Sequence, residues 1–246
     1  MTRAAGLAKY MPVSAKPLLV LWDIDHTLID GGEVSRRGYA AAFRRVSGRD
    51  LEQAWQFDGR TELAAATEVL RLHGIDPGNG TLERFTGLIV EELRERAAEF
   101  TREGRVLPGA IEALRGLQAI DAVRQSVLTG NLYPIAVLKL TALGLDGYLD
   151  LRIGAFGGDA FERTGLPAAA FARTQEHLGH RHSGDDTVII GDTPRDMATA
   201  RAAGARAIAV ATGTATADQL RAAGADVVLA DLTDTDAVVQ AVRRNQ

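Results

Sequence analysis

The 246-residue chain contains no cysteine. This absence excludes a disulfide framework, a thiol nucleophile and a zinc site with cysteine ligands. Aromatic residues make up only 5% of the chain, which argues against a surface that stacks on bases. The 28 basic and 32 acidic residues nearly balance, so no overall basic field would attract nucleic acid. We therefore expect no nucleic-acid partner.

The chain also lacks any run approaching the roughly 20 apolar residues that span a membrane. Residues 1–17 carry charge but no continuous apolar segment, so they do not resemble a signal peptide. We expect them to form a frayed or disordered leader, in which Met11 offers a second start. The expected location is the cytoplasm, with no membrane association, and the expected state is a monomer or homodimer.

Short apolar runs alternate with helical patterns along most of the chain. Continuous apolar runs of this kind are typical of parallel strands buried on both faces, and proline and glycine mark the ends of the helices. The pattern predicts an α/β fold with a Rossmann-like, three-layer parallel-sheet core. The expected strands lie at 18–22, 126–128, 187–190, 207–210 and 227–229, and the expected helices at 108–120, 134–143 and 194–203.

One segment breaks this alternation. Three helical stretches, at roughly 33–46, 60–73 and 81–102, follow one another with no strand between them. We therefore predict that residues 31–104 form an inserted all-helical cap domain. Residues 18–30 and 105–246 then form the core.

Polar residues follow the strands that appear most buried. Asp23 and Asp25 follow the first strand, and in open parallel sheets such strand ends form ligand sites. One carboxylate can attack an electrophile while the other transfers a proton. Taken alone, the pair could equally be a solvated acidic loop. Thr129, Gly130 and Asn131, which can bind anionic oxygens, follow the second strand.

The strand at 187–190 is followed by two further acids, Asp192 and Asp196. Helix capping explains Thr193 and Pro194 between them, but it does not explain the flanking acids. If the strand ends converge, four carboxylates crowd one small volume and raise one another's pKa values unless a cation neutralises them. The donors on offer are mainly oxygens, which favour Mg²⁺, and Mg²⁺ beside a nucleophilic carboxylate suits phosphoryl transfer.

In these motifs the chain resembles the haloacid dehalogenase superfamily of phosphohydrolases and phosphotransferases. Asp23–Thr27 matches the first motif, aspartate-x-aspartate-x-threonine. Thr129 matches the second motif, and Gly191–Asp196 matches the fourth. The helical insert lies where such proteins carry a cap of the first type. His26 departs from the commoner glycine and leaves the chain direction there less free.

The third motif, a basic residue before the fourth, matches less closely because the usual lysine-proline pair is absent. Arg163 lies about where that lysine would fall, and we favour it. The alternative is Lys139, one of only three lysines in the chain. His177, His180 and His182 form a cluster that we interpret as solvated.

The resemblance implies a role for each site residue. Asp23 would be the nucleophile that forms an aspartyl-phosphate, and Asp25 would protonate the leaving oxygen and then activate water. Arg163 would neutralise phosphate charge and orient Asp23. The resemblance also implies that Mg²⁺ is held by the Asp23 carboxylate, the Asp25 carbonyl, Asp192 and, through a water, Asp196, while Thr129, Gly130 and Asn131 bind the phosphoryl oxygens.

The leading interpretation is a Mg²⁺-dependent phosphatase for a small phosphorylated metabolite, similar to phosphoglycolate phosphatases, with Arg60 as a substrate contact. A phosphomutase of the β-phosphoglucomutase type would keep the same acids and stays open, whereas Asp25 disfavours a dehalogenase. A phosphonoacetaldehyde hydrolase needs a cap lysine, and the cap has none. A non-catalytic phosphate-binding or signalling module is the remaining alternative.

Overall fold

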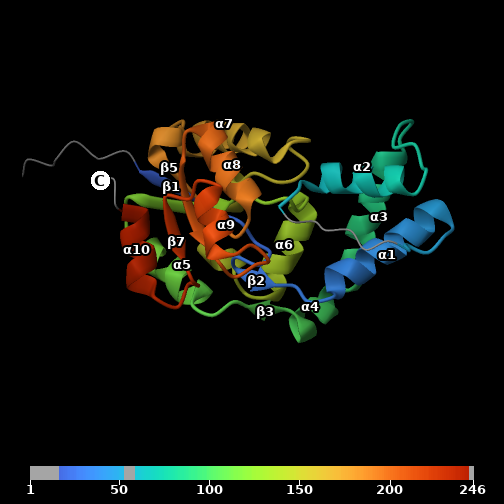
Figure 1. Ribbon diagram of the computed structural model, residues 1–246, viewed down its shortest axis with the longest axis horizontal. Helices are drawn as coiled ribbons and strands as arrows, with labels where there is room; N and C mark the ends of the chain where they lie inside the picture. Colours follow the sequence, from blue (N-terminus) through green and yellow to red (C-terminus); the bar gives the residue numbers. More distant parts are fainter. Residues whose placement is uncertain (1–16, 53–58, 244–246) are drawn as a thin grey trace, which may run out of the picture.

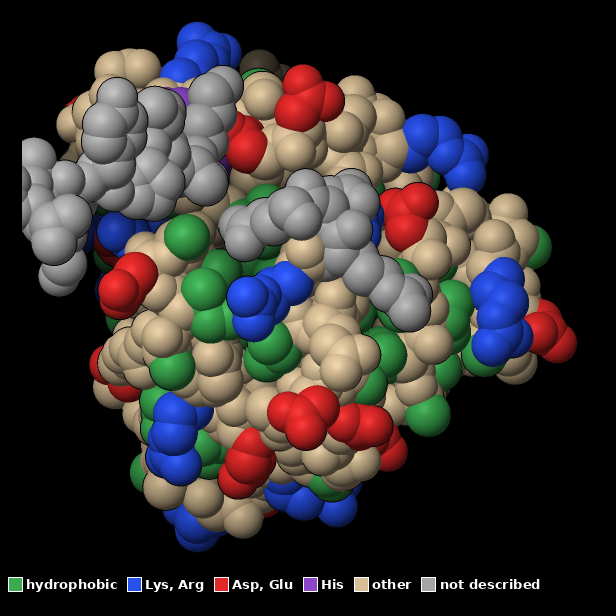
Figure 2. Space-filling model, turned by 90° about the vertical axis from the view of Figure 1, so that its left-hand side faces the viewer, with side chains coloured by type: hydrophobic (Ala, Val, Ile, Leu, Met, Phe, Trp, Pro, Cys, Tyr) green, Lys and Arg blue, Asp and Glu red, His purple; other side chains and the backbone are tan. Residues whose placement is uncertain are grey.

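The computed structural model describes residues 17–52 and 59–243 (Figure 1). The predicted leader, apart from Pro17, lies outside the described residues. None of the described helices is long and apolar enough to cross a membrane. On the side opposite the helical insert, acidic and basic side chains are interspersed wherever the surface is not covered (Figure 2).

The core is one parallel sheet with strand order β4-β1-β5-β6-β7. β1 lies between β4 and β5, with Leu21 opposite Ser126 on one side and Ile189 on the other. All five strands were expected from the apolar runs, and the predicted parallel sheet is confirmed. The strands are β1 (Leu18–Trp22), β4 (Val123–Val127), β5 (Thr187–Gly191), β6 (Arg206–Val210) and β7 (Val227–Leu229).

Helices cover both faces of the sheet. Successive side chains of β1 point to opposite faces, so apolar side chains on each face pack against a layer of helices. Val20 and Trp22 point into one core and Leu19 and Leu21 into the other. Figure 1 shows the resulting three layers. One face carries α5 (Ala110–Gln118), α6 (Tyr133–Ala142) and α10 (Thr235–Arg243), and the other carries α7 (Leu166–Leu178), α8 (Pro194–Ala203) and α9 (Ala217–Ala222).

The helical insert comprises α1 (Val34–Ser47), α2 (Glu62–Leu72), α3 (Thr81–Glu95) and α4 (Ala97–Glu103). The third predicted helix, 81–102, is in fact two helices that meet at Arg96. The Arg96 guanidinium donates to the carbonyl of Glu92, while its backbone amide bonds Leu93 instead. This local competition interrupts the helical hydrogen bonding.

The insert has its own apolar core. Phe85 is fully buried, and its ring lies edge-on to Tyr39 (centroids 5.3 Å apart) and to Phe43 (6.1 Å). Ile135 of α6 packs into the same cluster, so α6 joins the insert to the sheet. The chain enters and leaves through a short antiparallel pair, β2 (Ile29–Asp30) and β3 (Arg105–Val106).

The expectation that the histidine cluster is solvated is wrong for His182, which is only 1% exposed. Its Nε2 lies 2.9 Å from the Pro17 carbonyl, and its backbone amide donates to Thr174 Oγ1. Burial lowers the pKa of His182 below its ordinary value. The ring therefore packs against the chain just before β1, a contact with no local sequence signal.

The insert core predicts the effect of truncating Phe85. Phe85→Ala should cost about 3–5 kcal/mol, because the cavity would lie among rings that are already fully packed. Urea denaturation followed by circular dichroism measures this loss. Leu72→Ala is the control: Leu72 is 54% exposed and should change stability by less than about 0.5 kcal/mol. Equal losses in the two variants would contradict the assigned core.

Candidate active site

The first acidic motif lies where the chain leaves β1 and turns sharply. The Asp23 amide donates to the Ile190 carbonyl, which extends the pairing with β5. His26 then adopts a left-handed backbone, with φ 61°, and its amide donates to the Ile29 carbonyl. Glycine adopts this conformation without a steric penalty from a Cβ atom, so the turn costs more conformational free energy with histidine at this position than with glycine. The turn leaves Asp23 and Asp25 both facing one cavity.

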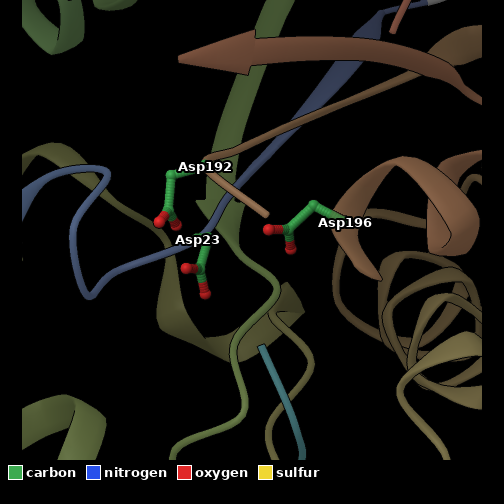
Figure 3. Close-up of side chains that lie close together, drawn as sticks. All are labelled: Asp23, Asp192 and Asp196. Carbon is green, nitrogen blue, oxygen red and sulfur yellow. The ribbon is translucent and has the colours of Figure 1, made fainter. Parts of the chain in front are cut away.

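Three carboxylates from two strand ends meet at the carboxyl edge of the sheet (Figure 3). One oxygen from each of Asp23, Asp192 and Asp196 lies within 4.8 Å of the others. The residues are 6%, 2% and 0% exposed, respectively. Thr27 Oγ1 donates to Asp192 at 3.3 Å and ties the first motif to the fourth. The predicted convergence of the strand ends is therefore present.

Asp196 differs from the other two acids because both its oxygens already accept hydrogen bonds. Oδ1 accepts from Arg163 at 2.5 Å. Oδ2 accepts from the Thr193 amide (3.0 Å) and hydroxyl (2.6 Å), in a capping box that begins α8. Gly191 makes room for it, since a Cβ at that position would overlap the Asp196 carboxylate. Asp196 thus anchors Arg163 and the start of α8.

The two candidate bases have different partners. Arg163, in the short 3₁₀ helix η3 (Arg163–Gly165), donates from one nitrogen to Asp23 (2.8 Å), Asp196 and the Leu128 carbonyl (3.2 Å). Lys139 instead donates to both oxygens of Asp25, at 2.8 and 2.7 Å. The geometry therefore supports Arg163 as the partner of Asp23.

Lys139 belongs to a network that the motifs did not indicate. Its ammonium also donates to Asn131 Oδ1 at 2.8 Å, and the Asn131 amide donates to Asp25 (2.7 Å) and to Thr129 Oγ1 (2.8 Å). Lys139 is only 3% exposed. The available signal was a single lysine within an otherwise apolar stretch of helix, because such a lysine needs a partner for its charge.

The acids divide electrostatically into two groups. Burial raises the pKa of Asp23 to about 7, and the nearby carboxylates of Asp196 and Asp25 add to the rise. Burial likewise raises the pKa of Asp192 to about 8. For Asp25, burial is opposed and outweighed by Lys139 and Asn131, which hold its pKa below the ordinary value. Asp23 and Asp192 therefore lack sufficient positive charge nearby, and this donor set is compatible with a divalent metal ion.

A cavity of about 440 Å³ joins these residues to the helical insert. The floor is the sheet edge, and the insert contributes Tyr39, Ile89, Leu93 and the predicted substrate contact Arg60. Arg60 is ion-paired with Glu68 of the insert. Its backbone oxygen lies so close to Gly130 that a Cβ there would overlap it. Core and insert residues thus enclose one site together.

Such a site, with carboxylates at the edge of a parallel sheet beneath a helical insert, defines an α/β protein with an acidic cavity between its core and its insert. A family model for the haloacid dehalogenase-like hydrolases matches residues 20–201. The chain belongs to this family, which confirms the resemblance of its motifs.

Named relatives fit the same picture. The chain is 29% identical to a probable phosphatase, IndB, of Dickeya dadantii, over 87% of this chain and 89% of that protein. It is 27% identical to a phosphoglycolate phosphatase of Pectobacterium atrosepticum, over 87% and 88%. The crystal structure of CbbY from Rhodobacter sphaeroides in complex with phosphate shares the fold, with a TM-score of 0.69, 20% identity and coverage of 89% and 96%.

The site predicts that two of its acids respond differently to neutral substitution. If the acidic cluster holds Mg²⁺, Asp192→Asn should weaken Mg²⁺ binding more than about tenfold, because it removes a negative charge from the cluster. Asp196→Asn should keep the affinity within a few-fold but lower stability by about 1–3 kcal/mol, because its oxygens serve Arg163 and Thr193. Calorimetric titration of the substrate-free protein and thermal unfolding measure the two effects. The reverse order of affinities would contradict the assignment.

Proposed function

We propose that the protein is a Mg²⁺-dependent phosphatase that hydrolyses a small phosphorylated metabolite through an aspartyl-phosphate. The observation that carries the proposal is the pair of acids in one cavity with opposite surroundings. Asp23 lies beside Arg163 and the acidic cluster, whereas Asp25 is held by Lys139 and Asn131. This difference supports Asp23 as the acid that attacks and Asp25 as the acid that transfers a proton.

The acidic cluster fits Mg²⁺, since its donors are hard oxygens and two of its acids lack a full counter-charge. Asp23 and Asp192 would hold the ion through their carboxylates, together with the Asp25 backbone carbonyl. The bound ion would neutralise charge on the transferring phosphoryl oxygens. Asp196 would contact the ion only through a water, and it would also hold Arg163 in place.

Each step of the reaction has a residue in place. Asp23 attacks phosphorus and displaces the ester oxygen, which takes a proton from Asp25. The resulting Asp25 carboxylate then removes a proton from a water that attacks the aspartyl-phosphate, so inorganic phosphate leaves and both acids return to their starting forms. Lys139 favours the base form of Asp25, and an entering phosphate dianion favours the acid form.

The second strand end would bind the phosphoryl oxygens. Thr129 Oγ1 accepts hydrogen bonds from the amide and the side chain of Asn131, which leaves its own hydroxyl proton to donate. The backbone of Gly130 and Asn131 and the Arg163 guanidinium complete the proposed phosphate contacts. Release of inorganic phosphate separates this function from a phosphomutase, in which a sugar hydroxyl replaces water, and from a module without turnover.

The proposed roles predict different defects for the two acids. Asp23→Asn removes the attacking charge, so no phospho-enzyme should form. Asp25→Asn should let the aspartyl-phosphate accumulate, because no base activates water. Its phosphorylation step should slow about 10²–10⁴-fold for an alkyl phosphate but much less for nitrophenyl phosphate, whose leaving group needs no proton. Single-turnover assays with trapping of the acyl phosphate measure both steps.

Two outcomes would overturn these roles. An Asp23→Asn protein that still becomes phosphorylated would remove Asp23 as the nucleophile. Equal slowing for aryl and alkyl esters in Asp25→Asn would remove Asp25 as the acid.

Lys139 predicts a pH effect. In the hydrolysis of the aspartyl-phosphate formed from nitrophenyl phosphate, Asp23 is esterified and Asp25 acts as the base, so the rate of this step falls as pH drops through the pKa of Asp25. Lys139 lowers that pKa, so Lys139→Met should move the acidic limb of the pH profile upward by about 1–3 units. Lys139→Arg keeps the charge and serves as the control. An acidic limb at the same pH in Lys139→Met and wild type would show that Lys139 does not set the ionisation of Asp25.

A further inference from the structure

Glu62 and Asp30 are the acids of the cavity that the proposed mechanism does not use, and of these two only Glu62 has no basic partner among the described residues. It is the first residue of α2 and lines the cavity, yet it is only 8% exposed. Its Oε1 is buried and accepts no well-formed hydrogen bond from the described residues, and the Tyr39 hydroxyl is the side-chain group that interacts with its carboxyl group. A buried acceptor without a partner is costly, so such an atom calls for an explanation.

A purely structural role does not explain this side chain. Acids at the start of a helix interact favourably with the helix dipole, but they normally do so in water. Here the Glu62 amide donates to the Gly130 carbonyl at 2.8 Å, which fixes the residue against the second strand end. That bond needs no carboxyl group. The side chain therefore lies in the cavity without stabilising the contact that places it there.

The other acids that line the cavity around Glu62 are accounted for. Asp192 belongs to the proposed metal site. The remaining three each have a basic partner: Asp23 pairs with Arg163, Asp25 with Lys139 and Asp30 with Arg105. The insert cations at the cavity wall are also engaged, Arg60 with Glu68 and Arg36 with Glu33.

The surroundings of Glu62 place it on the leaving-group side of the site. Burial raises the pKa of Glu62 to about 7, and the charges that act on it are those of Lys139 and Asp25. The Tyr39 side chain also lies next to it. Asp25 is the group proposed to protonate the ester oxygen. A substituent carried by the departing alcohol would therefore meet Glu62.

We propose that Glu62 determines specificity: its Oε1 accepts a hydrogen bond from a hydroxyl of the departing alcohol, and its carboxyl group rejects an alcohol that carries a carboxylate there. The inference rests on the proposed phosphatase function. It assigns this chain phosphomonoesters of neutral polyols or sugars, a substrate class different from the one named for its Pectobacterium atrosepticum relative. A hydroxyl satisfies the buried acceptor, whereas a carboxylate adds a second anion to it.

Two esters of matched size test the assignment: 2-hydroxyethyl phosphate, which ends in a hydroxyl, and phosphoglycolate, which ends in a carboxylate. For each, kcat/KM is divided by the value for nitrophenyl phosphate, which has neither group. We expect wild type to favour 2-hydroxyethyl phosphate by about tenfold or more. Glu62→Gln removes the charge and adds amide donors, so it should raise the relative kcat/KM for phosphoglycolate about tenfold. Glu95→Gln makes the same change at an exposed position on α3 and should keep the wild-type ratio.

The outcomes separate this inference from the proposed function. Wild type that favours phosphoglycolate, or a Glu62→Gln ratio equal to that of wild type, overturns the role of Glu62 while the phosphatase stands. No Mg²⁺-dependent release of phosphate from any of the three esters overturns the proposed function and this inference together. Because the wild-type ratio is itself decisive, the test does not depend on the folding of the variant.

Discussion

The site depends on one buried guanidinium. Arg163 contacts Asp23 and Asp196 at 2.8 and 2.5 Å, and all three residues are buried. Burial opposes the charge of Arg163, but the two carboxylates outweigh it and raise its pKa. Without this cation, Asp23 and Asp196 would be buried with no basic partner among the described residues. Arg163 thus permits the acidic cluster to exist, while leaving Asp192 short of positive charge.

Much of this arrangement could be predicted because it depends on local pattern. The apolar run at 18–22 favours a strand covered on both faces, and the acids that follow such a strand lie at the sheet edge. The helix at Pro194–Ala203 was predicted with both ends correct, because proline begins it and Gly204, at φ 66°, ends it.

What could not be predicted depends on contacts between distant residues. Lys139 was considered as a partner of Asp23, but it reaches Asp25, 114 positions earlier in the chain. His182 was expected in solvent because nothing near it in sequence reveals that it packs against Pro17. The break at Arg96 depends on a side chain that competes with the backbone for one carbonyl. In each case the outcome depends on particular hydrogen-bonding atoms, which residue patterns do not specify.

The scarcity of lysine has a practical consequence. Lys139 is the only lysine after Lys16. Its side chain is 4% exposed and donates hydrogen bonds to Asp25 and Asn131. Among the described residues an amine-directed reagent therefore meets one ε-amino group, and that group lies in the candidate active site. Acylation of Lys139 requires its ammonium group to leave Asp25 and lose its proton. The extent of labelling therefore measures how often the hydrogen bonds to Asp25 and Asn131 break. Within the described residues, Lys139 is therefore the one amine whose labelling measures access to the cavity.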